Sequence, residues 1–465
     1  MSAPLLWILL PLAFGMLLLF ARSTRQSAAV GVVGALLLAL AALALPIDAP
    51  IRLVGDFGIR ISPSFSVLGR RLVLTNAARP LIAGVYLSAA VWFAGAYVAR
   101  LEPTFVGLAF DLVALLLAAL AVRPFLYAAL IIEAAVLLSV PLLSPPGSSA
   151  GRGVLRFLTL QTLGMPFILL TGWMLVGTET SLPGTALALR SEVLLGIGFA
   201  LLLGVFPFHS WAPMLGEEVH PYAAALVLLA LTTVVAIFGL FFLERYAWLR
   251  EAETVYRWLR LIGALMIVLN GLLAAFQRHA GRALGYGLLM DTGFGLFALG
   301  AGGKAGLALF FALLPPRVLL FALWAVALSG LGRRRDGLSY PELAGIGAEA
   351  PLLLAAAVLA PLALAGIPLF VAAPTRLAIW KLSSNLGTYW LAAILLGSAG
   401  LAAAAFRLLG VLVATDAEKP WASTETADEW VWVGGLLLAA ILLGVFVGFW
   451  VHGAAKAALL FPHLR

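Results

Sequence analysis

The chain has 465 residues, of which 63% are hydrophobic and 11% are charged, and its net charge is +8. This composition excludes an ordinary soluble domain and indicates an integral membrane protein. The absence of cysteine excludes disulfides, iron–sulfur clusters and thiolate metal sites. We assign the positive charge to membrane topology and lipid headgroups and expect no nucleic-acid partner.

Long, continuously apolar runs recur along the whole sequence. Each is long enough to cross a hydrocarbon core of about 30 Å as an α-helix. The strands of a membrane β-barrel would alternate apolar and polar residues, which these runs do not. The sequence therefore predicts an all-α integral membrane protein of about 14 transmembrane helices, near 3–21, 28–46, 81–99, 104–121, 124–143, 157–177, 191–211, 222–243, 258–276, 282–300, 304–332, 351–380, 388–414 and 430–451.

The flanks of these runs carry the topology signals. Arg22 and Arg25 follow the first run and no basic residue precedes it, so we expect a retained span rather than a cleaved signal. Basic clusters in short loops fall on the side opposite both termini, which the positive-inside rule makes cytoplasmic, although the loop 47–80 carries five arginines on the other face. Alternating apolar residues predict a surface hairpin within that loop.

Two spans contain helix-breaking residues. Gly204 and Pro207 lie close to His209, and the segment 361–381 contains Gly366, Pro368 and Pro374. Proline removes a backbone hydrogen bond and clashes with the preceding turn, so the freed carbonyls need other partners. A pair of interrupted helices is typical of transporters with inverted repeats. The alternative is that both are ordinary kinked packing helices.

Several ionisable residues interrupt the apolar runs. Glu133 lies near the middle of its run, where a buried carboxylate is costly, so we predict a proton-path role; the alternative is a protonated glutamate bonded for packing. Asp111 and Asp291 are less central and fit either function or an interfacial cap. Arg317 and Arg376 follow prolines inside long runs and need a carboxylate or water within reach.

The usual signatures of substrate chemistry are missing. The sequence has no Ser/His/Asp set at a usual spacing and no metal-ligand cluster, and its histidines lie in loops or at run ends, where they cannot hold a haem. The stretch GAGGKAG at 300–306 departs from a phosphate-binding loop because Ala298 and Ala305 replace required residues. We therefore expect no catalytic residue, metal or cofactor, and movement of protons or small ions remains.

Four motifs in order carry a family resemblance. PFHSWAP at 207–213 resembles the P-x-H-x-W-x-P signature of the antiporter-like membrane subunits of respiratory complex I. This family also includes multisubunit cation/proton antiporters and the membrane arms of energy-converting hydrogenases. The segments 274–295, 317–330 and 364–381 resemble further family motifs, the last in the form typical of subunit N. The resemblance covers roughly residues 120 to 410.

The resemblance implies two inverted five-helix repeats, each with a broken helix, and no cofactors. Accordingly, we expect N-terminal helices with a hairpin loop, a first repeat, a second repeat and a C-terminal helix, with boundaries at 1–100, 101–250, 251–415 and 416–465. The resemblance also implies a proton relay. In it, Glu133 matches the family's glutamate, and Arg376 and Arg317 occupy positions where the family has lysine. The candidate relay residues are Glu133, Arg376, Arg317, Asp291, His209 and Asp111.

The departures from the family pattern concern the relay. Leu202 stands at the expected seventh-span lysine and the eighth-span lysine falls at or beside Val234. Asp291 replaces the relay histidine, and His279 and Gly281 replace an acid and lysine pair. Arginine holds its proton far more tightly than lysine does. Conduction through the first half of the chain is therefore in question.

Three functions fit these observations. The leading one is a membrane-arm subunit of a complex I-like NADH-quinone oxidoreductase that takes part in proton translocation. It would be a multi-pass protein of the inner (cytoplasmic) membrane, whose partners are other membrane subunits and the lipid bilayer. The second is a subunit of a cation/proton antiporter, an inorganic-carbon uptake complex or an energy-converting hydrogenase. The third is a structural subunit that does not pump.

Overall fold

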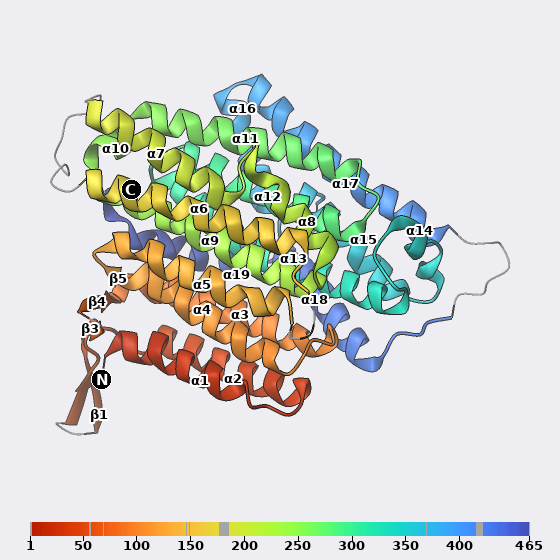
Figure 1. Ribbon diagram of the computed structural model, residues 1–465, viewed down its shortest axis with the longest axis horizontal. Coiled ribbons are helices and arrows are strands. Elements are labelled where there is room, and N and C mark those ends of the chain that lie inside the picture. Colours follow the sequence, from red (N-terminus) through yellow and green to blue (C-terminus); the bar gives the residue numbers. More distant parts are fainter. Residues whose placement is uncertain are drawn as a thin grey trace.

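The computed structural model describes residues 2–54, 57–67, 69–145, 147, 149–175, 186–368, 370–414 and 422–464. This part of the chain forms a bundle of long helices that lie side by side (Figure 1). Twelve of its helices are long and apolar enough to cross a membrane, and three shorter apolar helices accompany them. One of these, Val447–Leu460, directly continues the span Ala427–Val445. The prediction of an all-α membrane protein with about 14 spans is confirmed.

The first half of the chain begins with the π-helix η1 (Leu5–Leu9), which continues into α1. Its α-helices are α1 (Leu10–Leu18), α2 (Thr24–Ala44), α3 (Arg79–Val98), α4 (Thr104–Ala121), α5 (Ala128–Leu143), α6 (Arg152–Met174), α7 (Ala186–Leu203), α8 (Trp211–Glu218), α9 (Pro221–Arg245) and α10 (Ala247–Glu251).

The second half contains the remaining long helices and the C-terminal elements. They are α11 (Glu253–Ala275), α12 (Ala280–Gly300), α13 (Gly303–Arg334), α14 (Tyr340–Leu343), α15 (Pro351–Ala365), α16 (Ala373–Leu386), α17 (Thr388–Val413), α18 (Ala427–Val445) and α19 (Val447–Ala455). Short 3₁₀ helices follow α19, of which η6 (Lys456–Leu460) matters below.

The connection between α2 and α3 forms two small antiparallel sheets. β1 (Pro50–Val54) pairs with β2 (Phe57–Arg60). β3 (Ser64–Val67) pairs with β4 (Arg70–Val73), and β4 also pairs with β5 (Val122–Arg123), which places Leu72 opposite Val122. Both sheets lie at the end of the bundle near the N-terminus (Figure 1).

Two transmembrane segments are broken where the sequence predicts it. α7 ends at Leu203, Gly204 adopts a φ of +66°, and the short 3₁₀ helix η4 (Phe208–Ser210) leads into α8. α15 ends at Ala365, Gly366 adopts a φ of +108°, and α16 begins at Ala373. Glycine tolerates these left-handed conformations, which lets a helix end inside the bundle. In each set of five spans, starting at α4 and at α11, the broken segment is the fourth.

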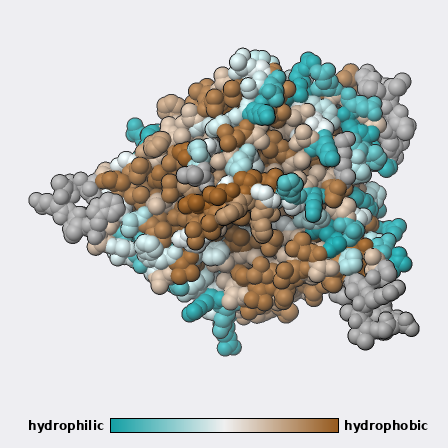
Figure 2. Space-filling model, turned by 180° about the vertical axis from the view of Figure 1, so that it is seen from behind, coloured by the Kyte–Doolittle hydropathy of each residue, from teal (hydrophilic) through white to brown (hydrophobic). Residues whose placement is uncertain are grey.

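The most buried helices are α4, α9, α12 and α13, and α12 is buried at every residue except Arg282 in its first turn. α12 and α13 run through the middle of the bundle (Figure 1). By contrast, α2 and α18 are largely exposed. Figure 2 shows that apolar side chains cover most of the middle of the face seen there, as a lipid-facing surface requires. The side chains of Asp291 and Thr292 on α12 therefore face protein rather than lipid.

Small residues bring two pairs of helices into close contact. A Cβ atom added at Gly216 of α8 would collide with the Gly281 carbonyl of α12, and the reverse collision also holds. Gly271 of α11 meets Gly397 and Gly400 of α17 in the same way. Such contacts allow backbones to approach closely, which is the usual basis of helix packing in membranes. The first contact fixes α12 against α8 of the broken segment, and the second fixes α11 against α17.

Candidate functional site

Three of the predicted relay residues, all from the second half of the sequence, contact one another inside the bundle. Asp291 of α12 forms a short ion pair with Nη2 of Arg376 on α16. Its other oxygen, Oδ2, lies 3.3 Å from Nε of Arg317 on α13. All three are buried, with 5%, 2% and 4% of the surface of Asp291, Arg376 and Arg317 exposed. We call these residues the Asp291 cluster.

The break between α15 and α16 positions Arg376. This residue lies in the first turn of α16, and its Nε donates a 2.8 Å hydrogen bond to the Leu364 carbonyl at the end of α15. That carbonyl has lost its helical partner because α15 stops at Ala365. The carboxyl end of a helix also carries partial negative charge, which favours a cation there. In addition, the guanidinium lies 3.7 Å from the centre of the Phe294 ring, a stabilising cation–π contact.

Two threonines that the sequence analysis missed hold Arg317. Its Nη2 donates to Oγ1 of Thr232 at 2.7 Å and to Oγ1 of Thr292 at 2.9 Å. Each threonine hydroxyl in turn donates to the carbonyl four residues earlier, at Leu228 or Leu288. Both hydroxyls are thereby oriented as acceptors toward the guanidinium. Thr232 comes from α9, so the cluster links three spans and the broken segment.

The Asp291 cluster carries an excess of positive charge. It contains two guanidinium groups and one carboxylate, and its other partners are neutral oxygens and an aromatic ring. An arginine keeps its proton under all ordinary conditions, so the carboxyl group of Asp291 is the one acidic group of the cluster. Protonation of Asp291 would raise the charge of the cluster from +1 to +2. A proton at this position therefore changes the forces on both arginines.

Glu133 lies apart from the Asp291 cluster, on α5. Its side chain is partly exposed, and Thr162 of α6 donates a 2.6 Å hydrogen bond to Oε1. Oε2 is buried and has no hydrogen-bond partner within the described chain. Leu202 and Val234, which stand at the expected lysine positions, are both buried. Among the described contacts, none joins Glu133 to the Asp291 cluster, so its place in a relay stays a prediction.

His209 lies in η4, at the break between α7 and α8. Its ring is close to those of Phe206 and Tyr286, and Nδ1 has no hydrogen-bond partner among the residues described. The nearby carboxylates have partners: Glu217 lies 3.2 Å from Arg282 of α12, and Glu218 accepts a 2.6 Å hydrogen bond from a backbone amide of α6. The polar stretch is thus tied to protein, and a role for His209 in proton movement stays a prediction.

Asp111 is buried on α4 and faces α1. A Cβ atom added at Gly15 would collide with Oδ1 of Asp111, so the carboxyl group packs directly on the α1 backbone. Oδ1 has no hydrogen-bond partner within the described ranges. The described contacts do not link Asp111 to the other candidate residues. The described residues also contain no group of three or more His, Asp or Glu side chains that could hold a metal ion.

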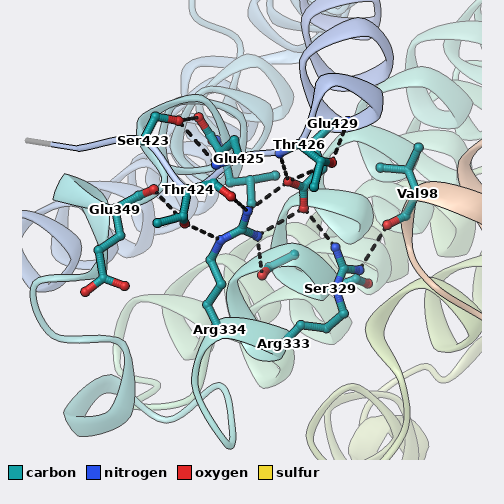
Figure 3. Close-up of polar contacts among 12 residues, drawn as sticks. Val98, Ser329, Arg333, Arg334, Glu349, Ser423, Thr424, Glu425, Thr426 and Glu429 are labelled. Carbon is teal, nitrogen blue, oxygen red and sulfur yellow. Dashed lines mark hydrogen bonds and ion pairs between the residues drawn. The ribbon is translucent and has the colours of Figure 1, made fainter.

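A second ionic cluster lies at the end of α13 (Figure 3). Oε1 of Glu429 on α18 accepts hydrogen bonds from Arg333 at 2.8 Å and Arg334 at 3.0 Å, and Oε2 accepts one from the Thr426 amide. Glu429 therefore pairs with two arginines at once and also closes the capping box of α18. The sequence assigned these arginines to topology alone, because their partner lies about 95 residues away.

His220 connects this end of the molecule with α9. It caps α9, because its Nδ1 accepts a 3.3 Å hydrogen bond from the Tyr222 amide. Burial and, to a smaller extent, the positive charge of Arg333 lower the pKa of His220, and a hydrogen bond to the Ala99 backbone opposes them; the pKa that results is about 4. The imidazole is therefore neutral at pH 7.

Relatives of known name cover the chain to different extents. It is 30% identical over 479 residues to NADH-quinone oxidoreductase subunit 13 of Thermus thermophilus, covering 98% of both chains. It is 28% identical over 275 residues to NADH-quinone oxidoreductase subunit N of Rhodococcus opacus. That match covers 58% of this chain and spans only 50% of the relative.

Solved structures share the fold at lower identity. A chain of respiratory complex I from Thermus thermophilus matches with a TM-score of 0.78 and 21% identity over 99% of both chains. A chain of the Mrp complex from Dietzia sp. matches with a TM-score of 0.82 and 15% identity, over 99% of this chain and 97% of that one. At these identities the likeness concerns the fold.

A protein-family model assigns the chain to a family. The model described as NADH:quinone oxidoreductase/Mrp antiporter, TM, matches residues 155–402, which is more than half of the chain. This range contains both broken segments and the whole Asp291 cluster. The full-length similarity to the Thermus subunit agrees with the match. The chain belongs to the NADH:quinone oxidoreductase/Mrp antiporter family of multi-pass membrane proteins.

Proposed function

We propose that this chain is a membrane-arm subunit of an NADH-quinone oxidoreductase and takes part in proton translocation. It would act in the inner (cytoplasmic) membrane, together with other membrane subunits of the complex. The observation that carries the proposal is the buried Asp291 cluster beside the broken segment α15–α16. Buried ionisable residues in transmembrane helices are costly and usually mark ion pathways. The full-length relative named as a subunit of this enzyme supports the assignment.

In this proposal Asp291 is the group that exchanges protons. The two arginines remain charged, so they act as fixed charges that hold an ionised Asp291 between them. When Asp291 takes up a proton, its attraction for Arg376 and Arg317 weakens, and the two arginines repel each other without a carboxylate between them. Arg376 sits at a helix break, where small backbone movements are least constrained by helical hydrogen bonds. A proton at Asp291 would therefore be coupled to movement of α16.

The other candidate residues would extend the relay. Glu133 is partly exposed on the side of α5 and hydrogen-bonded only to Thr162 among the described contacts, so it would exchange protons with a neighbouring subunit. His209 would serve at the break between α7 and α8, and Asp111 at the α1–α4 contact.

One observation favours a second function, that of a subunit which braces the membrane arm without pumping. Leu202 and Val234 fill the expected lysine positions and are buried among apolar side chains. A proton would find no ionisable side chain at either position. Chains of an Mrp complex and of a membrane-bound sulfane sulfur reductase share this fold. Membership of a different kind of complex is therefore the other alternative.

Two measurements test the proposal. Solubilisation in a gentle detergent through a tag on this chain, followed by mass spectrometry, identifies the partners. Iron–sulfur and quinone-reducing subunits are expected; recovery of antiporter subunits alone would refute the assignment to an oxidoreductase.

The second measurement uses the whole complex reconstituted in vesicles. Asp291→Asn and Glu133→Gln should lower the number of protons pumped per quinone reduced, because each removes a titratable group. Glu253→Gln is the matched control, since Glu253 lies at an exposed helix end. Unchanged pumping in both test variants would favour the bracing function.

A further inference from the structure

An apolar cavity of about 370 Å³ lies among α3, α4, α9 and α13, with α18, α19 and η6 contributing at its edge. Its walls consist of aliphatic and aromatic side chains, such as Leu81, Leu117, Leu229 and Phe311. The four helices that form the main walls, α3, α4, α9 and α13, all belong to candidate membrane spans. The volume is within the range of cavities that bind small ligands. The proposed function assigns no ligand to this cavity.

The polar residues of the cavity wall are Ser88, Thr233 and Arg317, and Trp92 adds an indole N–H. Oγ1 of Thr233 and Nε1 of Trp92 have no hydrogen-bond partner among the described residues. Ser88 donates its hydroxyl hydrogen to the Gly84 carbonyl at 2.7 Å, so it is satisfied within α3. Arg317 contributes to the wall, but its charged end is held by Thr232 and Thr292 on the other side. Apart from these two polar atoms and Arg317, the wall is almost entirely aliphatic and aromatic, and apolar cavities bind apolar ligands. The chemistry therefore favours a hydrocarbon occupant over water.

The dimensions of the cavity match half of a bilayer. Its lining extends along α3 from Pro80 to Trp92, which at 1.5 Å per residue is about 18 Å. Half of a hydrocarbon core is about 15 Å thick. Gly84 and Leu87 are exposed at one side, so the cavity opens to the lipid-facing surface of α3. One acyl chain from one leaflet fits this space in length and direction.

A lysine lies beside the end of the cavity that Pro80 forms. Ala454 and Ala457 line the cavity, and the exposed Lys456 lies between them in sequence. η6, which contains Lys456, packs against the start of α3, where Pro80 forms the end of the cavity. A phospholipid whose acyl chain follows α3 would bring its phosphate to this end. Basic residues at membrane surfaces attract such headgroups.

We propose that this cavity binds one phospholipid, with an acyl chain between α3 and α9 and the phosphate beside Lys456. The bound chain fills a space that would otherwise lack packing partners. It also excludes water from the side of Arg317 that faces the cavity. The lipid thus completes the apolar insulation of the Asp291 cluster on this side of the bundle.

A photoreactive phospholipid tests the proposal on the unaltered protein with its partners. Phosphatidylglycerol that carries a diazirine in the middle of an acyl chain should cross-link to residues of α3 and α9 that line the cavity. Cross-links confined to other surfaces, or to a partner subunit that covers the cavity, would overturn the proposal.

A matched pair of glycine variants adds a second test. A Cβ atom at Gly84 would meet open space, so Gly84→Leu should fold normally and place its side chain in the opening. Gly410 of α17 is also open but does not line the cavity, so Gly410→Leu is the control. Because two buried methylene groups of the lipid would be displaced, cross-linking should fall roughly tenfold in Gly84→Leu only. Equal cross-linking in both variants would refute the site.

The natural absence of cysteine allows a test for water in the cavity. Leu229→Cys places a single thiol in the cavity wall. A charged, water-soluble maleimide should not react with it while lipid is bound. Rapid labelling in native membranes would mean that the cavity is hydrated, and would overturn the proposal.

Discussion

Replacing Asp291 by asparagine keeps the shape of the side chain and removes the one negative charge of the Asp291 cluster. Arg317 and Arg376 would then be buried with no carboxylate between them, and the charge of the cluster would rise from +1 to +2. Breaking a buried ion pair from one side costs about 3–5 kcal/mol. Both arginines keep other acceptors, at Thr232 and the Leu364 carbonyl, so we expect about 3 kcal/mol here.

Thermal unfolding of the purified protein in detergent, followed by fluorescence of its 13 tryptophans, measures this loss. Asp336→Asn makes the same chemical change at an exposed position and should cost less than about 0.5 kcal/mol. Arg376→Gln alone lowers the charge of the cluster to zero, and the double variant with Asp291→Asn returns it to +1. The losses of the two single variants should therefore not add, and their coupling should lie in the range of about 0.5–3 kcal/mol.

The reasoning has two clear points of failure. If Asp291→Asn unfolds at the same temperature as Asp336→Asn, the arginines do not depend on Asp291 for charge compensation. If the losses of Asp291→Asn and Arg376→Gln add within error, the two residues do not interact in the folded protein.

Three further outcomes are expected. Glu429→Gln keeps the capping hydrogen bonds of α18 but removes the charge that faces two arginines. The free energy of unfolding in detergent should therefore fall by about 2 kcal/mol. Asp428→Asn, in the same helical turn, is the control and should change it little. Gly281→Ala should cost about 1–3 kcal/mol in the same assay because its Cβ atom meets the backbone of α8, whereas Gly410→Ala, in open space, should be neutral or slightly stabilising. The buried His220 has a pKa of about 4, below its ordinary value of about 6.5. The stability that its neutral form contributes is therefore complete above about pH 6.5 and is lost as the pH falls toward 4. His220→Asn, which still caps α9, should make the free energy of unfolding less dependent on pH over that interval.

Hydropathy alone determined the spans of this protein. A helix in lipid must satisfy its own backbone hydrogen bonds, so a sufficiently long apolar run can be read directly as a span. The expected run 104–121 coincides with α4, and the runs near 282–300 and 388–414 differ from α12 and α17 by two residues or fewer. Glycine and proline likewise marked both helix breaks, because their backbone limits act locally.

The candidate site was determined only in part by the sequence. Asp291, Arg317 and Arg376 attracted attention because charge inside an apolar run is costly wherever it lies. Their common location depends on contacts between residues as far as 85 positions apart, such as that of Arg376 with Asp291. Thr232 looked like an ordinary member of an apolar run, and only its approach to Arg317 gives it a role.

Tertiary packing alone decided the rest. The sequence shows Arg333 and Arg334 as a basic cluster, whereas the structure pairs both of them with Glu429 on a distant helix. The apolar cavity is invisible in the sequence, since each of its walls reads as a normal span and the space arises where four helices fail to fill their common centre. Local chemistry determines which segments enter the membrane and where they break; the contacts among them decide which buried charges meet and which surfaces remain for lipid.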